Sequence, residues 1–233
     1  MLKTQNRLLL ALQQHKGSHI ESVVERGVLQ RGAIIAEAGD DLLHVHFPED
    51  CVLSLLSLLG NGTHIETATI GREGAFGALA SLGRPISSTR CMVQVEGPVS
   101  KVPVQFLRAA TVREPQLLEL FIRYVQATIF QIQQSAACNA SHGVEKRLAR
   151  WLLEMSDRGE TSRLELTHEF LAGMLGANRG TISIAAGALQ EAGCISYRRG
   201  NVEVLDQGRL RAACCECYGV VREHEALLYP PTG

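Results

Sequence analysis

Between residues 166 and 195, apolar positions recur with helical spacing in two short runs. The positions are Leu171, Ala172 and Leu175 in the first run, and Ile182, Ala185 and Leu189 in the second. Gly176 stands between the runs, where the chain needs a residue that tolerates positive φ. Thr167 and Asn178 are placed to cap the two helices. The spacing predicts a helix-turn-helix; an ordinary helical hairpin is the alternative.

Two short strand-like runs follow, over residues 194–197 and 202–205. The connection Arg198-Arg199-Gly200-Asn201 contains Gly-Asn, a hairpin signal. A β-hairpin directly after the second helix predicts a winged helix-turn-helix. In this motif the second helix enters the DNA major groove, led by its N-terminal residues. Arginines near the wing tip would contact backbone phosphates, or would simply be solvated.

The start of the second helix holds the candidate base-contacting residues. Arg179 is the best candidate for a bidentate contact with guanine. Thr181 and Ser183 could bond to bases or phosphates, and Ile184 could touch a thymine methyl group. The expected DNA-binding residues are Thr167, Asn178, Arg179, Gly180, Thr181, Ser183, Ile184, Arg198 and Arg199.

Residues 28–105 show a different pattern, of short apolar runs punctuated by glycines. The runs cover residues 33–36, 43–47, 52–59, 92–95 and 99–104. Many short strands with regular turn signals predict an antiparallel sandwich or barrel. Before them, residues 1–20 are predicted to form an amphipathic lead-in helix.

After Pro115 the apolar spacing alternates between four and three residues. The positions are Leu118, Ile122, Val125, Ile129, Ile132 and Ala136. This heptad pattern predicts a helix of about 25 residues, which packs on its own domain or on a second copy. We favour a dimer because helix-turn-helix proteins usually read two half-sites through two-fold symmetry. His142-Gly143 then marks a hinge, and residues 144–155 form another amphipathic helix.

Composition and charge limit these predictions in one respect. The 233 residues are 45% hydrophobic and 20% charged, which is ordinary for globular proteins. The formal net charge is −1, and residues 142–233 carry no basic excess either. A DNA-binding surface must therefore be locally positive, around Arg179, Arg198 and Arg199.

Localisation signals are weak throughout the sequence. The apolar run near the N-terminus is too short for a secretory signal, and residues 51–59 fall short of a membrane span. Seven cysteines without framework-like spacing agree with a reducing compartment. We expect a cytoplasmic protein with no membrane partner.

The order of these parts resembles the Crp/Fnr family of bacterial transcription regulators. The most specific segments are VEKRLARWLL from Val144 and LTHEFLAGMLGANRGTIS from Leu166; GAIIAEAG from Gly32 and IGREGAFG from Ile70 are looser. The resemblance implies an α+β fold with an N-terminal antiparallel β-roll, a long dimerisation helix and a C-terminal winged helix-turn-helix. It implies a β-roll effector domain with lead-in helix over 1–112, a dimerisation helix over 113–142 and a DNA-binding domain over 143–233. The implied partners are double-stranded DNA, a second copy, RNA polymerase and an unidentified small-molecule effector, with no enzyme activity.

The sequence departs from family members that bind cyclic AMP. Those members bind the ribose through Gly-Glu-Leu and the phosphate through Arg-Ser or Arg-Thr. At the matching positions this chain has Gly77-Ala78-Leu79 and Ser88-Thr89-Arg90. The resemblance places an effector pocket at Gly74, Gly77, Ala78, Leu79, Ser88, Thr89 and Arg90. Without the carboxylate and a preceding arginine, we do not expect cyclic-nucleotide binding by the usual mode.

Other cofactors of the family find little support in the sequence. An iron–sulfur cluster is not expected, because the first cysteine is Cys51 and neither the lead-in nor the roll has clustered thiols. Haem ligation by His44, His46 or His64 is left open, so the cofactor stays unknown.

Two other groups of residues could hold a metal. Cys214-Cys215-Glu216-Cys217, with His224 beyond, could form a metal or redox site, but no second ligand pair is evident and buried thiols are the simpler interpretation. His44, His46 and Glu49 resemble part of a cupin motif. The alternative function is therefore a metal-dependent cupin-like β-roll enzyme or sensor whose C-terminal helices serve only assembly. The effector, the operator and the choice between activation and repression stay open.

Overall fold

The computed structural model describes residues 3–15 and 19–228. The chain divides into two compact units. The first contains residues 1–55, 69–130 and 224–233, and the second contains 56–68 and 131–223. The predicted three-part division of the chain remains a prediction.

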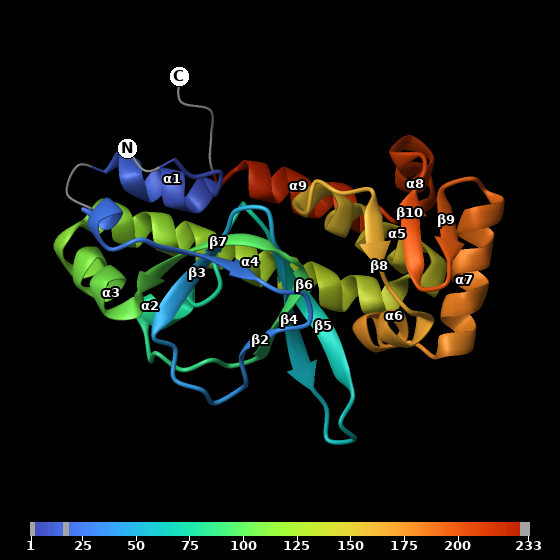
Figure 1. Ribbon diagram of the computed structural model, residues 1–233, viewed down its shortest axis with the longest axis horizontal. Coiled ribbons are helices and arrows are strands. Elements are labelled where there is room, and N and C mark those ends of the chain that lie inside the picture. The colour runs from blue at the N-terminus through green and yellow to red at the C-terminus, as the bar shows by residue number, and fades with distance from the viewer. Residues whose placement is uncertain (1–2, 16–18, 229–233) are drawn as a thin grey trace. The chain divides into compact units, whose positions relative to one another are not determined.

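An antiparallel β-roll dominates the N-terminal half (Figure 1). Its strands are β1 (Glu25–Leu29), β2 (Ile34–Ala36), β3 (His44–Pro48), β4 (Val52–Leu58), β5 (His64–Ile70), β6 (Arg90–Val95) and β7 (Gly97–Pro103). They form two sheets, with strand orders β1-β7-β3 and β2-β6-β4-β5. The predicted antiparallel fold is confirmed, and all five apolar runs fall on strands. The apolar pattern missed β1 and β5 because their sequences, ERGVL and HIETATI, are rich in polar residues.

The lead-in helix is shorter than the sequence analysis predicted. Helix α1 (Arg7–Gln14) begins after Asn6, whose side-chain oxygen accepts a hydrogen bond from the Leu9 N–H at 2.9 Å. The Asn6 side-chain amide also donates to the carbonyls of Pro48 and Gly74, so the cap fixes where the helix starts. A 3-10 turn, η1 (Ile20–Ser22), follows. Positions 1–2 and 16–18 of the predicted helix lie outside the described residues.

One short helix interrupts the roll between β5 and β6, and two helices follow its last strand, β7. They are α2 (Ala78–Leu82), α3 (Val104–Arg113) and α4 (Pro115–Ser141). The long helix predicted from Pro115 is present, and proline suits its first position because the missing N–H has no helical partner there. In the first unit α4 buries Leu117, Leu120, Phe121, Tyr124 and Ala127. The buried stripe is therefore not the predicted heptad stripe, most of which stays exposed.

The second unit is built on helix α5 (Val144–Arg158). It also contains α6 (His168–Leu175), α7 (Arg179–Glu191), α8 (Gln207–Ala213), most of α9 (Cys217–Ala226) and the strands β8 (Arg163–Glu165), β9 (Ile195–Arg198) and β10 (Asn201–Val204). Leu148, Trp151 and Leu152 of α5 are fully buried, as their helical spacing predicted. The strands form a small sheet in the order β8-β10-β9. Among the described helices, none is long and apolar enough to cross a membrane.

Candidate nucleic-acid interface

Helix α6 begins and ends where the sequence predicted. The Thr167 hydroxyl oxygen accepts a hydrogen bond from the Phe170 N–H at 3.1 Å and caps the N-terminus. The helix ends at Gly176, which adopts φ +57° in the left-handed region. Arg147 of α5 donates to the carbonyl of Leu175, so a buried cation satisfies the last turn of α6.

Helix α7 presents one apolar face and one solvent face, as predicted. The side-chain oxygen of Asn178 accepts from the Thr181 N–H at 2.8 Å and from the Thr181 hydroxyl at 2.9 Å. Ile182, Ala185 and Leu189 are buried under the helix. The solvent face of its first turns carries Arg179, Gly180, Ser183 and Ile184. An isoleucine that is 77% exposed, beside an exposed arginine, marks a surface suited to contact another molecule.

Three side chains that the sequence analysis missed connect α6, α7 and the wing. His168 Nδ1 lies 2.8 Å from the Ser183 hydroxyl, and its ring lies 4.4 Å from the ring of Tyr197. Tyr197 donates its hydroxyl to the carbonyl of Leu166, and its N–H donates to the Gln190 side chain. Burial, and then the positive charge of Arg179, lower the pKa of His168, which favours the neutral imidazole. No spacing in the sequence indicates these contacts, because they join residues up to 31 positions apart.

The wing turn is shorter than the predicted four-residue connection. Arg198 pairs with Asn201, so the turn consists of Arg199 and Gly200, with φ of +49° and +80°. Two central residues with positive φ are the signature of a type I′ turn, whose twist matches the strands. Both arginines are exposed, and the carbonyl of Gly200 accepts a hydrogen bond from the Leu166 N–H at 2.6 Å.

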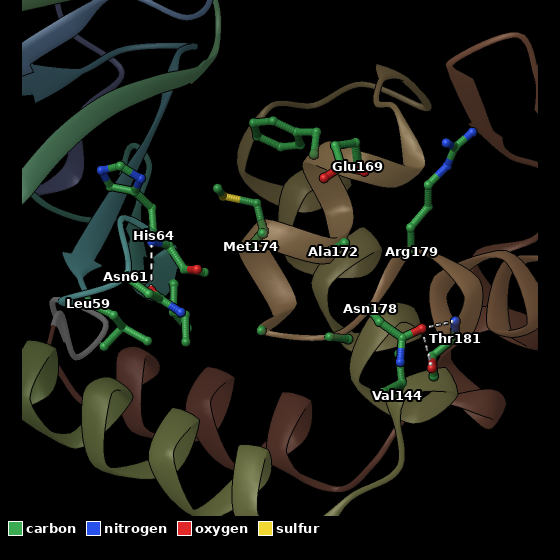
Figure 2. Close-up of a pocket in the computed structure, with 16 residues that line it drawn as sticks. Leu59, Asn61, His64, Val144, Glu169, Ala172, Met174, Asn178, Arg179 and Thr181 are labelled. Atoms are coloured by element: carbon green, nitrogen blue, oxygen red, sulfur yellow. Dashed lines mark hydrogen bonds between the residues drawn. The ribbon is translucent and has the colours of Figure 1, made fainter.

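A cavity of about 1000 Å³ lies within the second unit, beside the start of α7 (Figure 2). Asn61 and His64, from the connection between β4 and β5 and from β5, line it on one side; Met174 of α6 and Asn178 line it on the other. Figure 2 shows that Met174 is directed across the cavity, whereas Arg179 extends away from the connection between β4 and β5. No pattern in the sequence indicates this cavity, because its walls are far apart along the chain.

The residues expected to form an effector pocket have several internal partners. The Arg90 guanidinium makes two hydrogen bonds with the Glu37 carboxylate, at 2.6 and 2.8 Å. The Tyr124 hydroxyl bonds to both the N–H and the carbonyl of Ala75, and a Cβ on Gly74 would lie 2.4 Å from that ring. Gly77 adopts φ +88° before α2, where Ala78 is buried and Leu79 is 60% exposed. Ser88 is exposed, and Thr89 accepts a hydrogen bond from Ser87 through its carbonyl.

The cupin-like residues have partners that leave little room for a metal. Both carboxylate oxygens of Glu49 accept hydrogen bonds, from the hydroxyls of Thr4 and Ser100 and from the N–H groups of Gln5 and Asn6. His46 is half-buried beside Lys101, and burial first, then Lys101, lowers the pKa of His46 to about 4. In the described part of the chain, the residues with metal-ligand spacing are instead Cys138, His142, Cys215 and Cys217.

Comparisons with known proteins agree with this architecture. Residues 146–213 match the family model of the Crp-like helix-turn-helix domain. The global nitrogen regulator of Synechococcus elongatus is 24% identical over 88% of this chain and 96% of that protein. The corresponding regulator of Nostoc sp. is 25% identical over 88% and 95%.

Solved structures share the fold. FixK2 from Bradyrhizobium japonicum superposes with a TM-score of 0.69 at 17% identity, covering 83% of this chain and 98% of that one. The c-di-GMP responsive regulator CLP from Xanthomonas campestris superposes with a TM-score of 0.65 at 13% identity, covering 84% and 99%. Residues 146–213 therefore form a Crp-like helix-turn-helix domain, and the chain as a whole is similar to Crp/Fnr transcription regulators in sequence and in fold.

Proposed function

We propose that this regulator acts as a homodimer that binds a near-palindromic operator, with α7 of each copy in the major groove. The observation that carries this proposal is the solvent face of α7, where Arg179, Ser183 and Ile184 are exposed over a buried apolar face. The N-terminal residues of such a helix contact base edges in helix-turn-helix proteins. We infer the same orientation here.

Each proposed contact follows from the chemistry of its side chain. Arg179 would donate two hydrogen bonds to a guanine, and Ile184 would contact a thymine methyl group. Gly180 would let the backbone approach the DNA, since it carries no side chain. Thr181 and Ser183 would contact bases or phosphates. Thr167 and Asn178, at the helix N-termini, and the wing residues Arg198 and Arg199 would contact backbone phosphates.

The exposed stripe of α4 supports the proposed homodimer. Ile122 and Ile129 are 43% and 49% exposed, while the opposite face of the helix is buried in its own unit. The stripe as a whole comprises Leu118, Ile122, Val125, Ile129, Ile132 and Ala136. A second copy that packs its stripe against this one would remove these side chains from water, at about 25 cal/mol per Å² of apolar surface.

For the β-roll we propose a sensory role with an unidentified small molecule. Arg90 is already paired with Glu37, so a cyclic phosphate would have to break this ion pair to reach the guanidinium. This supports an effector other than a cyclic nucleotide bound by the usual mode. RNA polymerase is the proposed further partner, and the cytoplasm the proposed location. The division into a β-roll domain over 1–112, a dimerisation helix over 113–142 and a DNA-binding domain over 143–233 belongs to the same proposal.

The cupin-like alternative is not favoured. Glu49, one of its three candidate ligands, is fully engaged by the segment before α1 and by Ser100. This disfavours a cupin-like metal site formed by His44, His46 and Glu49.

Selection of binding sites from a random DNA library tests the proposed function directly. We expect recovered sites with two related half-sites separated by about 10 base pairs, centre to centre. The variant Arg179→Ala should lose about 1–3 kcal/mol of affinity for these sites and relax the preference at one base pair per half-site.

Arg199→Ala is the matched control, because it removes the same charge from the wing. It should weaken binding to selected and unselected DNA alike. Unchanged sequence preference in Arg179→Ala would show that the recognition surface lies elsewhere. Failure to select any sequence would contradict the whole proposal.

A further inference from the structure

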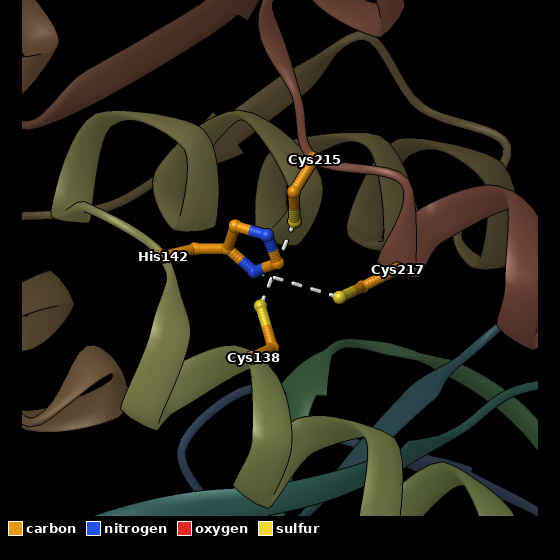
Figure 3. Close-up of side chains that lie close together, drawn as sticks. All are labelled: Cys138, His142, Cys215 and Cys217. Carbon is orange, nitrogen blue, oxygen red and sulfur yellow. Dashed lines mark hydrogen bonds between the residues drawn. The ribbon is translucent and has the colours of Figure 1, made fainter.

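Four metal-binding side chains converge inside the second unit (Figure 3). The sulfur atoms of Cys138, Cys215 and Cys217 and the imidazole of His142 point toward one another. Each contributes one ligand atom, and all four atoms lie within 4.8 Å of one another. The three cysteines are buried, with exposed fractions of 3% or less. A buried cluster of free thiols and one imidazole is unusual unless the groups serve a common purpose.

The distances within this cluster fit a single tetrahedral metal ion. Cys138 Sγ lies 3.6 Å from Cys215 Sγ, and Cys217 Sγ lies 3.7 Å from His142 Nδ1. Ligand bonds of about 2.3 Å to sulfur and about 2.0 Å to nitrogen place tetrahedral ligand atoms about 3.5–3.8 Å apart. Two of the ligand pairs already have this spacing, and the other pairs lie within 4.8 Å, so small side-chain movements would close all four ligands around one ion.

The ligands come from two places in the chain. Cys138 lies in the last turn of α4 and His142 directly follows the helix, where the His142 N–H donates to the Cys138 carbonyl at 3.0 Å. Cys215 and Cys217 lie between α8 and the first turn of α9. The second ligand pair that the sequence analysis did not find is thus Cys138-x3-His142. His224 does not take part, since its ring stacks on Phe130 at 3.9 Å.

Neighbouring polar groups are arranged as they are around metal-bound histidines and cysteines. His142 Nε2 lies 3.2 Å from the Glu216 carboxylate, and donation of Nε2–H would leave the lone pair of Nδ1 directed at the cluster. The Gln134 side chain donates to the sulfur of Cys217 at 3.1 Å. Arg150 interacts electrostatically with Cys138 and Cys215, where its charge can offset the excess negative charge of three thiolates around a divalent ion.

We propose that this regulator binds one zinc ion per chain through the thiolates of Cys138, Cys215 and Cys217 and Nδ1 of His142. Three thiols lose their protons to solvent as the ion binds, and no electron is transferred. A set of four protein ligands leaves no open position, which is typical of structural rather than catalytic zinc. The ion would hold the start of α9 against the end of α4. One of its ligands, His142, belongs to the His142-Gly143 segment that leads into α5.

The same geometry argues against two other uses of these thiols. An iron–sulfur cluster spreads its cysteines over several iron atoms, whereas these four ligand atoms surround one point. A disulfide between Cys138 and Cys215 would leave Cys217 and His142 without a role, although both face the same centre.

Metal analysis of the purified full-length chain tests the proposal. Protein prepared without chelators should contain about one zinc per chain by elemental mass spectrometry. Cobalt(II) should replace the zinc and give the intense visible bands of a tetrahedral thiolate site. In the zinc-bound chain, Cys138, Cys215 and Cys217 should resist alkylation until a chelator is added. These measurements use the unmutated protein, so they do not depend on whether variants fold.

Variants then identify the ligands. Cys138→Ser and Cys217→Ser should each weaken zinc binding by at least a hundredfold. Glu216→Ala, which removes only the partner of His142, should weaken it about 10- to 100-fold. Cys214→Ser is the matched control, because the Cys214 thiol donates to the Arg211 carbonyl outside the cluster. It should retain one zinc per chain.

Three results would overturn the proposal. They are a metal-free chain whose three thiols are freely alkylated, a disulfide revealed by intact mass before reduction, and stoichiometric iron with inorganic sulfide. None of these results depends on DNA binding, so the zinc site and the proposed function are tested independently.

Discussion

Asn178 fixes the start of helix α7 through one side-chain oxygen. That atom accepts hydrogen bonds from the N–H and the hydroxyl of Thr181, so it satisfies a donor that the helix cannot satisfy itself. The same residue stands next to Arg179, on the surface proposed to face DNA. Substitutions at this position can separate its structural contribution from its proposed contact with phosphate.

Two variants of Asn178 should have different effects, one on stability and the other on DNA binding. Asn178→Ala should lower the free energy of unfolding by about 1 kcal/mol, because the cap is lost. Asn178→Asp should keep the cap and nearly all of the stability, yet weaken DNA binding by about 1 kcal/mol through repulsion between its charge and the phosphates. Chemical denaturation and fluorescence anisotropy with a selected site measure the two effects. Equal DNA affinity of Asn178→Asp and the unmutated chain would exclude a phosphate near this residue.

His46 makes the stability of the β-roll depend on pH. Burial first, and then the charge of Lys101, lower its pKa from 6.5 to about 4, so the folded state favours the neutral ring. The stabilisation is fully present above pH 6.5 and is lost as the pH falls toward 4, by up to about 3 kcal/mol. His46→Gln should flatten this part of the curve of unfolding free energy against pH. Lys101→Met should raise the pKa of folded His46, so the loss should be smaller and end at a higher pH; if neither variant changes the curve, other groups cause the dependence.

At the scale of elements, the wing shows how a turn can conflict with the residue that occupies it. The β9–β10 hairpin requires positive φ at both turn positions, and glycine meets this requirement at position 200. Arg199 meets it only with strain, because its Cβ crowds the backbone when φ is +49°. Its exposed charge near the proposed phosphate contacts offers a reason for keeping an unfavourable residue there.

Arg199→Asn should therefore change stability and DNA affinity in opposite directions. Asparagine tolerates the left-handed conformation, so the free energy of unfolding should rise by about 1 kcal/mol. The slope of the logarithm of DNA affinity against the logarithm of salt concentration should fall by about 1 in magnitude. Arg198→Ala, at a strand position with ordinary φ, should reduce the salt slope without stabilising the wing. No gain in stability for Arg199→Asn would mean that the turn is not strained.

At the scale of the whole molecule, α4 carries two apolar stripes with different surroundings. The one that includes Leu117, Phe121 and Tyr124 is buried, whereas Ile122 and Ile129 of the predicted heptad stripe stay exposed. A single chain therefore leaves a long apolar strip in water. This strip is the feature that the proposed dimer would cover.

Ile122→Glu should convert the proposed dimer to a monomer. Two carboxylates facing each other near the two-fold axis would cost several kcal/mol, so the dimer Kd should rise by about 100-fold or more. The fold of each chain should not change, because the side chain is exposed. Gln126→Glu adds the same charge at an exposed position off the stripe and should leave the dimer intact. Light scattering measures the mass, and an unchanged mass for Ile122→Glu would place the interface elsewhere.

Local features of the second unit were predictable from the sequence. The caps at Thr167 and Asn178, the turn at Gly176 and the buried faces of α6 and α7 all appear where the spacing placed them. Capping and helical periodicity act over a few residues, so a short stretch of sequence contains the whole cause. The family resemblance added the β-roll and the order of the parts.

Features that join distant segments emerged only from the folded chain. Cys138 and Cys215 are 77 positions apart, and their sulfur atoms meet because α9 starts beside the end of α4. The contact between His168 and Ser183, the choice of buried stripe on α4 and the pairing of Arg90 with Glu37 have the same origin. Each depends on which surfaces the chain brings together, and no periodicity or spacing in the sequence encodes that meeting. Local interactions thus determined the helices of the helix-turn-helix, whereas long-range packing determined their polar contacts and the proposed zinc site.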